Sequence, residues 1–182
     1  ENTDHCFANH DRIAELNLYD GKAGRYFSGS PVPLAEELRT WALGEAEAIS
    51  SVTYPRERPY YVELSPEKTL PYELETIEID TCYNRIFTPE MVAGHWKMAS
   101  QSLNSVILSQ SMAIKIFGNA ESAIGKHMTL MRRLNTSPES TPKTGGIVYT
   151  IQAVMKDIPL NNSLDFMQNI DMLTVNDSEG LL

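Results

Sequence analysis

The first helical pattern with recognisable ends begins at Ser30-Pro31. A serine oxygen there accepts from the free amides of a first turn, and a proline loses no hydrogen bond that it would otherwise make. Leu34, Leu38 and Trp41 then recur at i, i+4 and i+7 as one apolar stripe. Gly44 ends this segment. We therefore expect an amphipathic helix here.

A second helix is predicted between Ser109 and Gly118. Ser109 is a suitable N-cap, and Gly118 suits a left-handed C-cap. Met112 and Ile116 form an i, i+4 apolar pair within it.

The segment between these helices has a β pattern. Residues 49–79 are rich in β-branched and aromatic side chains, and residues 72–76 place polar side chains at alternate positions. Ile77 and Ile79 lie on the opposite parity, which indicates either a bulge or a change of the buried face.

A hairpin with a long tip is predicted after the second helix. Met128 and Leu130 lie on one face of its first strand, and a polar loop from Asn135 to Gly146 follows. The second strand alternates, with apolar Tyr149, Ile151, Ala153 and Met155 on one face. Asp157-Ile158-Pro159 stops it.

Weaker patterns occur at both ends of the chain. Residues 4–13 fit a short helix, and Leu16 and Leu18 alternate with polar residues as in a strand. Leu164 to Val175 is apolar enough for one more strand or a short helix. The whole order of elements predicts an α+β fold in two lobes.

Composition narrows the class of protein. A chain of 182 residues suits one domain or two small lobes. The net charge of −9 argues against nucleic acid, whose phosphates would repel so acidic a surface. No apolar run approaches the roughly 18 residues that cross a bilayer. We interpret the sequence as a soluble piece excised from a longer protein.

Three groups of residues are candidates for chemistry, and each has a simpler explanation. His5, Cys6, His10 and Asp11 resemble a metal cluster, but the histidine spacing does not put both on one helix face. Ser109 and Ser111 with Lys115 resemble a serine–lysine pair, but no nucleophile-elbow glycines surround them. Carboxylates are also numerous, at Glu36, Glu37, Glu73, Glu75, Glu78 and Asp80, and the alternate glutamates are explained as the solvated face of a strand. We expect no cofactor, metal or catalytic residue.

Two alternatives stay open at this stage. Tyr54, Tyr60, Tyr61 and Tyr72 cluster with prolines and form either cross-strand packing pairs, which we favour, or a contact surface for a partner. Cys6 and Cys82 are either one disulfide or two free thiols.

Three sequence blocks change the interpretation. Residues 109–118 (SQSMAIKIFG) precede Ala123-Ile124-Gly125-Lys126, and residues 149–159 (YTIQAVMKDIP) run on to Asn161, Ser163 and Phe166. This succession resembles the periplasmic core domain of MacB-like, FtsX-like ABC transporter permeases. The matching motif residues are Ser109, Phe117, Gly118, Ile124, Gly125, Lys126, Asp157, Pro159, Asn161 and Ser163. Their physical roles are structural, because the glycines serve backbone conformations and Asp157, Asn161 and Ser163 satisfy turn amides.

The resemblance implies a non-catalytic, extracytoplasmic domain inserted between two membrane helices of an inner-membrane permease, facing the periplasm. Residues 1–182 would form one porter-like domain, with one lobe at about 1–104 plus 158–182 and an inserted helix-and-hairpin lobe at about 105–157. Both chain ends would point toward the membrane.

The resemblance also implies partners. They are the flanking membrane helices, a separate ABC ATPase that hydrolyses ATP, a second permease copy, and a periplasmic adaptor, lipoprotein or peptide substrate. The alternative is a stand-alone secreted binding or adhesion module that uses the tyrosine- and proline-rich surface.

Overall fold

The computed structural model describes residues 7, 9–27, 34–41, 44–100, 102, 104–130, 146–159 and 167–175. It is a mixed α+β protein, as the sequence predicts. The strands are β1 (Leu18–Asp20), β2 (Arg25–Phe27), β3 (Arg56–Ser65), β4 (Lys68–Ile79), β5 (Met91–Gly94), β6 (Ser105–Ser109), β7 (His127–Leu130), β8 (Ile147–Met155) and β9 (Met172–Val175). The helices are α1 (Leu34–Trp41), α2 (Tyr83–Phe87), α3 (Trp96–Ser100), α4 (Gln110–Phe117) and the 3-10 turns η1 (His10–Arg12) and η2 (Glu121–Ala123).

Seven of these strands form one sheet that closes on itself. Their order is β5-β8-β6-β9-β4-β3-β7, and β7 also pairs with β8. The pairings therefore run through a ring of six strands, with β5 added along the C-terminal half of β8. The pairs β4–β9 and β6–β8 are parallel, and the others in the sheet are antiparallel.

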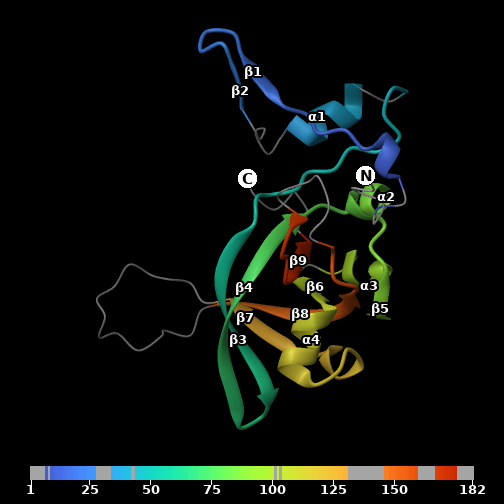
Figure 1. Ribbon diagram of the computed structural model, residues 1–182. Coiled ribbons are helices and arrows are strands. Elements are labelled where there is room, and N and C mark those ends of the chain that lie inside the picture. Colours follow the sequence, from blue (N-terminus) through green and yellow to red (C-terminus); the bar gives the residue numbers. More distant parts are fainter. Residues whose placement is uncertain are drawn as a thin grey trace.

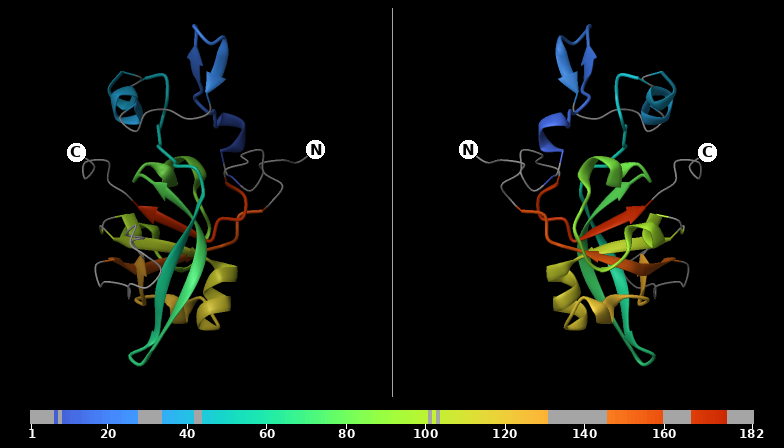
Figure 2. Two further views of the ribbon diagram at one scale, coloured as in Figure 1. Left: turned by 90° about the vertical axis from the view of Figure 1, so that its left-hand side faces the viewer. Right: turned by 90° about the vertical axis from the view of Figure 1, so that its right-hand side faces the viewer.

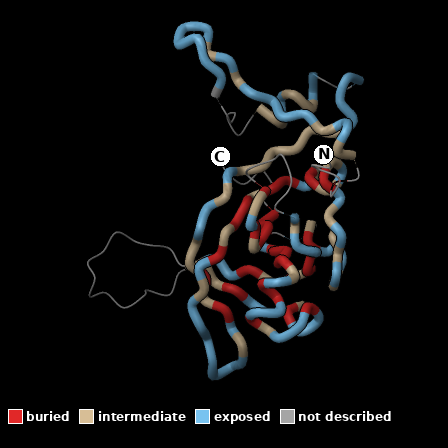
Figure 3. The backbone as a smooth tube through the Cα atoms, in the orientation of Figure 1, coloured by how far each residue is buried: buried red, intermediate tan, exposed pale blue. Residues whose placement is uncertain are grey.

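The side chains of the sheet divide between two hydrophobic clusters. All six strands of the ring contribute to the first, which includes Met112 and Ile116 of α4 and which we call the α4 cluster. The second includes Tyr83 and Phe87 of α2, and we call it the α2 cluster. Figure 3 shows the buried backbone concentrated in the sheet and in the helices against it.

Strand β4 passes from one cluster to the other along its length. Leu74 is buried in the α4 cluster, whereas Ile77 and Ile79 are buried in the α2 cluster. The reversed parity at Ile77 and Ile79 is therefore a change of buried face. The irregular pairing between β3 and β4 lies elsewhere, between Glu63 and Ser65 of β3.

Strand β8 contains a bulge that the alternating sequence pattern did not predict. Its register against β6 shifts between Ile151 and Ala153, so that Gln152 is the extra residue. Ile151 and Val154 consequently lie in the α4 cluster, whereas Ala153 and Met155 lie in the α2 cluster. The predicted single apolar face from Tyr149 to Met155 is wrong beyond the bulge.

Gly94 of β5 approaches the backbone of β8 at this bulge. It pairs with Ala153 at a φ of +69°. A Cβ atom on residue 94 would lie 2.2 Å from the carbonyl oxygen of Gln152 and 2.8 Å from the Cα of Ala153. Only glycine fits this contact.

The predicted local elements are largely present. Helix α4 has Ser109 as its N-cap, whose Oγ accepts from the Met112 amide at 3.4 Å, and Gly118 as its left-handed C-cap. Strands β7 and β8 form the predicted antiparallel hairpin, and residues 131–145 of its tip lie outside the described residues. The predicted C-terminal strand is present as β9, and residues 160–166 lie outside the described residues.

The N-terminal predictions are only partly met. Within the predicted helix at 4–13, the described part is the 3-10 turn η1, and Ile13 is already extended. The strand around Leu18 is present as β1 and pairs with β2. Helix α1 forms, but it buries none of its residues and Trp41 is 80% exposed, so its apolar stripe does not enter a core.

Residues 9–49, which we call the N-terminal unit, contain the β1–β2 hairpin and α1. Figures 1 and 2 show this unit projecting beyond one end of the sheet. Strands from both predicted lobes pair within the single sheet. The division of the domain into two lobes stays a prediction.

Candidate functional site at the junction of the N-terminal unit and the sheet

Asp80 is the centre of the junction between the N-terminal unit and the sheet. It follows the last residue of β4 and is 5% exposed. Oδ1 accepts from Ser50 Oγ at 2.8 Å and from the Cys82 amide at 2.9 Å. Oδ2 accepts from the Ser51 amide at 2.7 Å and from the guanidinium of Arg39 in α1. A buried carboxylate is stable here because each oxygen has two donors.

The strap of residues 47–53 crosses this junction and is held at several points. Arg39 donates from Nε to the Ile49 carbonyl at 2.9 Å. Arg85 of α2 donates to the Glu47 carbonyl at 2.7 Å, and the Glu47 carboxylate pairs with Arg12. The Thr53 amide donates to the Glu78 carbonyl of β4 at 2.9 Å. Helix α1, the strap, α2 and the end of β4 are thus joined in one network.

In the sequence Asp80 was one of several carboxylates and had no structural role of its own. It lies at the point where β4 ends and the chain turns into α2. The partners come from positions 39, 50, 51 and 82, and no local pattern shows that these positions meet. The alternation of Glu73 and Glu75 suggested only a solvent-facing strand.

A second group of carboxylates lies where β3, β4 and the start of β9 meet. Glu57 and Glu75 are direct cross-strand partners. The Glu75 amide donates to Asp171 Oδ2 at 2.9 Å. Burial raises the pKa of Glu75, and the negative charges of Glu57 and Asp171 raise it further.

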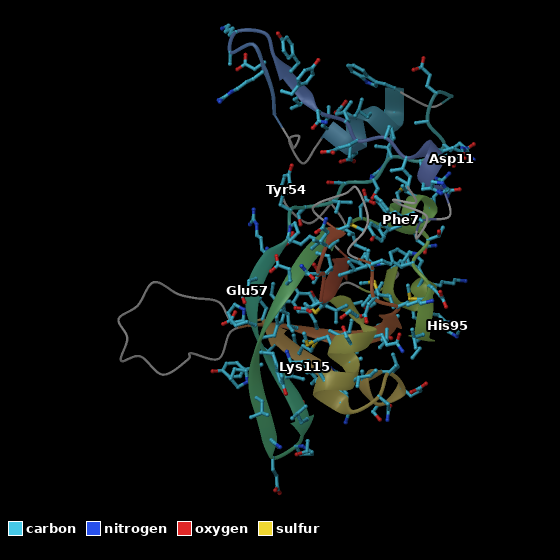
Figure 4. The ribbon with its side chains drawn as sticks, viewed as in Figure 1. Phe7, Asp11, Tyr54, Glu57, His95 and Lys115 are labelled. Carbon is cyan, nitrogen blue, oxygen red and sulfur yellow. The ribbon has the colours of Figure 1, made fainter. Side chains whose placement is uncertain are left out.

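The pKa of Asp171 is also raised. Burial is the main cause, and the charges of Asp157 and Glu57 act in the same direction. The hydrogen bond from the Glu75 amide and the positive charge of Lys115 oppose it. Figure 4 labels Glu57 and Lys115 on this part of the molecule.

The candidate serine–lysine pair is not assembled. Ser109 is buried, and its hydroxyl is occupied at the N-cap of α4. The Ser111 hydroxyl donates to Asp157 Oδ1 at 2.9 Å, and the Ser111 amide donates to the same oxygen at 3.0 Å. Lys115 is exposed one turn further along the helix. These serines have structural partners.

The remaining motif residues have backbone or packing positions. The Gly118 amide donates to the Ile114 carbonyl at 2.9 Å. The Gly125 amide donates to the Ile151 carbonyl at 2.8 Å, and Gly125 has a φ of +78°. Phe117 and Ile124 pack, half-buried, against the α4 cluster, whereas Lys126 and Pro159 are exposed. Asp157 accepts from Ser111 in the first turn of α4. Asn161 and Ser163 lie outside the described residues.

The four candidate tyrosines differ in their exposure. Tyr60 is 1% exposed and is the cross-strand partner of Tyr72, which packs half-buried against the same cluster. Burial raises the pKa of Tyr60 to about 12. Tyr61 is half-buried, and Tyr54 is 48% exposed (Figure 4). Tyr60 and Tyr72 are cross-strand partners and Tyr60 is buried, while a contact surface for a partner stays a prediction.

The candidate metal cluster and the candidate cysteine pair both include residues outside the described ranges. Among the described residues, no three His, Cys, Asp or Glu side chains are placed to hold a metal ion. His5 and Cys6 lie outside those residues, so the pairing of Cys6 with Cys82 stays open. Within the same described ranges, no helix is long and apolar enough to cross a membrane.

The closed sheet with α4 packed against it is a fold that a solved structure shares. A domain of a protein described as a permease, from Porphyromonas gingivalis, has this fold. It aligns over 96% of this chain and 70% of its own length, with a TM-score of 0.65 and 22% sequence identity. At that identity the likeness establishes the fold.

Two other solved structures are more distantly similar. One is the periplasmic region of MacB from Actinobacillus actinomycetemcomitans, with 16% identity over 87% of this chain and 62% of its own, and a TM-score of 0.48. The other is the extracellular domain of the noncanonic ABC-type transporter YknZ from Gram-positive bacteria. It has 15% identity over 79% of this chain and 63% of its own, and a TM-score of 0.45. No protein-family model matches the chain, and no curated protein matches its sequence.

Proposed function

We propose that this chain is the extracytoplasmic domain of an ABC transporter permease in the inner membrane, facing the periplasm. It is non-catalytic and passes ATP-driven motion of the membrane helices to a periplasmic substrate or partner. The fold shared with the Porphyromonas gingivalis permease domain is the observation that carries this proposal.

The positions of the first and last described residues support it. Phe7 and Val175 are both buried in the α2 cluster. Phe7 packs edge-on against Phe87 with ring centroids 5.3 Å apart, and Val175 pairs with Ile79, the residue before Asp80. The first and last described residues therefore both lie near the junction, as two membrane helices at one end would require.

The Asp80 network supports the mechanical part of the proposal. A rigid joint transmits displacement, whereas a loose one absorbs it. Because Asp80 ties α1, the strap and β4 together, movement of the chain near Phe7 and Val175 would move the N-terminal unit and the sheet as one body. The expected partners are the flanking helices, a separate ABC ATPase, a second permease copy and a periplasmic adaptor, lipoprotein or peptide.

The proposal is tested with the full-length gene product. We expect it to fractionate with the inner membrane, to be cleaved within this domain by protease added from the periplasmic side, and to co-purify with an ABC ATPase. A gene without an apolar segment of about 20 residues on each side of this domain contradicts the proposal. It would favour a secreted binding module, although burial of Tyr60 removes one residue of that module's predicted surface.

A further inference from the structure

The exposed aromatic side chains are concentrated in one part of the molecule. Among the described residues, every aromatic side chain that is exposed lies between positions 19 and 54. Tyr19 is 58%, Tyr26 72% and Trp41 80% exposed. The large exposed apolar residues beyond position 54 are all aliphatic, such as Leu70, Met98 and Ile114.

Tyr19, Tyr26 and Trp41 stand on the N-terminal unit, and Tyr54 lies just beyond it, before β3. Tyr19 and Tyr26 are cross-strand partners in the β1–β2 hairpin, with ring centroids 5.0 Å apart. Trp41 ends α1, whose apolar stripe enters no core. Figures 1 and 2 show the hairpin and α1 projecting together beyond the sheet. The unit thus presents amphipathic rings, which have an apolar body and a polar edge.

We propose that this surface rests in the headgroup region of a phospholipid bilayer. The inference builds on the proposed function, in which the segments before Phe7 and after Val175 lead to membrane helices. Phe7 and Val175 both lie near the junction between the N-terminal unit and the sheet. If their flanks enter the membrane, the surface on that side of the domain faces the headgroups. Tyrosine and tryptophan, rather than aliphatic residues, are the side chains enriched at this interface.

Local charge agrees with a headgroup partner. The chain carries −9 overall, whereas the hairpin Leu18–Phe27 carries Lys22 and Arg25 against one acid, Asp20. Asp20 Oδ1 accepts from the amides of Lys22 at 2.8 Å and Ala23 at 3.1 Å, so this oxygen is occupied within the turn. Cationic side chains at the hairpin tip would bind lipid phosphates, with their stems along the apolar layer.

A protein partner fits the same surface less well. Charged residues are depleted at the centre of protein interfaces. Here Asp20 and Arg25 are the cross-strand pair next to the Tyr19–Tyr26 pair, and Glu36 and Glu37 are exposed on α1 beside Trp41. Zwitterionic headgroups carry both a positive and a negative group, so they can bind acidic and basic side chains that lie close together. The bilayer expected is therefore zwitterionic, because an anionic surface would repel the acidic remainder of the chain.

Tryptophan fluorescence gives a direct test. The chain has two tryptophans, Trp41 and Trp96. Trp96 is half-buried and stacked on Tyr83 with ring centroids 5.9 Å apart. Trp96→Phe leaves Trp41 as the probe, and Trp41→Phe leaves Trp96 as the internal control. The 182-residue chain is anchored by a C-terminal His tag to phosphatidylcholine vesicles containing a nickel-chelating lipid, so that affinity does not limit contact.

On these vesicles we expect the emission of Trp41 to shift to shorter wavelength, because its ring enters the interface. Lipids brominated near the headgroup should quench this emission. Quenching by acrylamide should fall about twofold, because the ring becomes less accessible to water. Trp96 is expected not to respond. Tyr19→Ser with Tyr26→Ser should reduce the Trp41 response, whereas Ile114→Ser, an exposed apolar change on α4, should not.

Three results overturn the inference. The first is a Trp41 that stays as accessible to acrylamide on vesicles as in buffer. The second is a Trp41 shift that appears without vesicles as protein concentration rises, which assigns the surface to a second copy of the chain. The third is a response confined to anionic vesicles and abolished by Lys22→Gln and Arg25→Gln but not by the tyrosine changes. None of these results depends on an ATPase, so the inference can fail while the full-length protein still proves to be a permease.

Discussion

The guanidinium of Arg39 and the carboxylate of Asp80 form an ion pair between α1 and the end of β4. The two partners differ in burial, since the Arg39 side chain is 30% exposed and that of Asp80 is 7% exposed. Asp80 accepts from three further donors, whereas Arg39 also donates to the Ile49 carbonyl. The Asp80 carboxylate is therefore the element on which the junction depends.

Removing the carboxylate should cost far more stability than removing the guanidinium. Asp80→Ala leaves two backbone amides, a hydroxyl and a guanidinium without their acceptor, and we expect the free energy of unfolding to fall by about 3 kcal/mol. Arg39→Ala leaves Asp80 with three donors and should cost about 1 kcal/mol. Urea denaturation of the two variants measures the difference. Equal losses would mean that Asp80 is not the centre of this network.

A methyl group at position 94 should disrupt the pairing of β5 with β8. Gly94→Ala places the new Cβ against the carbonyl oxygen of Gln152. The oxygen is a backbone atom and the Cβ is bonded to the backbone, so neither can move away unless the main chain shifts. We expect a loss of about 3 kcal/mol or more. Gly118→Ala is the matched control, because Gly118 also has a positive φ but its Cβ would meet nothing within 4 Å.

Gly118→Ala should lower the free energy of unfolding by only about 1 kcal/mol, the cost of holding a residue with a side chain in the left-handed backbone conformation. Thermal or urea unfolding of both variants separates the steric effect from the backbone effect. If the two losses agree within about 0.5 kcal/mol, the close approach of β5 to the bulge in β8 is absent.

The carboxylates of Glu75 and Asp171 should make stability depend on pH. Their pKa values are raised in the folded protein, mainly by burial, so folding favours the protonated forms. Their stabilising contribution is complete below the unfolded pKa values near 4 and is lost as pH rises through the folded values. Glu75→Gln should therefore be more stable than the wild type at pH 7 and equal to it below about pH 4.

Glu57→Gln separates the two causes acting on Glu75. It removes only the repulsion across the strand pair, so its gain at pH 7 should be smaller than that of Glu75→Gln and should shrink in high salt. Chemical denaturation from pH 3 to 8 at two salt concentrations measures both effects. A Glu75→Gln variant that loses stability relative to the wild type as pH rises would contradict a raised pKa at Glu75.

The two serines at the start of α4 should act on stability alone. Ser109→Ala removes the N-cap acceptor of the Met112 amide, and we expect a loss of about 1 kcal/mol. Ser111→Ala removes one exposed hydrogen bond to Asp157, whose bond from the Ser111 amide remains, and should cost less than Ser109→Ala. Circular dichroism with urea measures both. Loss of an esterase or peptidase activity with Ser109→Ala at unchanged stability would instead make Ser109 a nucleophile.

Sequence alone determined the parts of this protein whose information lies in consecutive residues. Helix α4 was predicted with its serine cap and its glycine end, and the β7–β8 hairpin was predicted from two alternating runs. The change of face at Ile77 and Ile79 was one of two alternatives. These features depend on the periodicity of one segment and on the backbone preferences of single residues, which are readable without knowing what packs against them.

Tertiary structure decided the features that depend on distant segments. The pattern around β4 did not show that Asp80 would be buried, because its partners come from α1, the strap and α2. The bulge at Gln152 arises only where β8 pairs with β6, and the need for glycine at position 94 only where β5 meets β8. The stripe of α1 was read correctly as apolar, but whether it enters a core depends on what lies opposite it. Periodicity specifies which side chains share a face; the contacts between segments specify what that face meets.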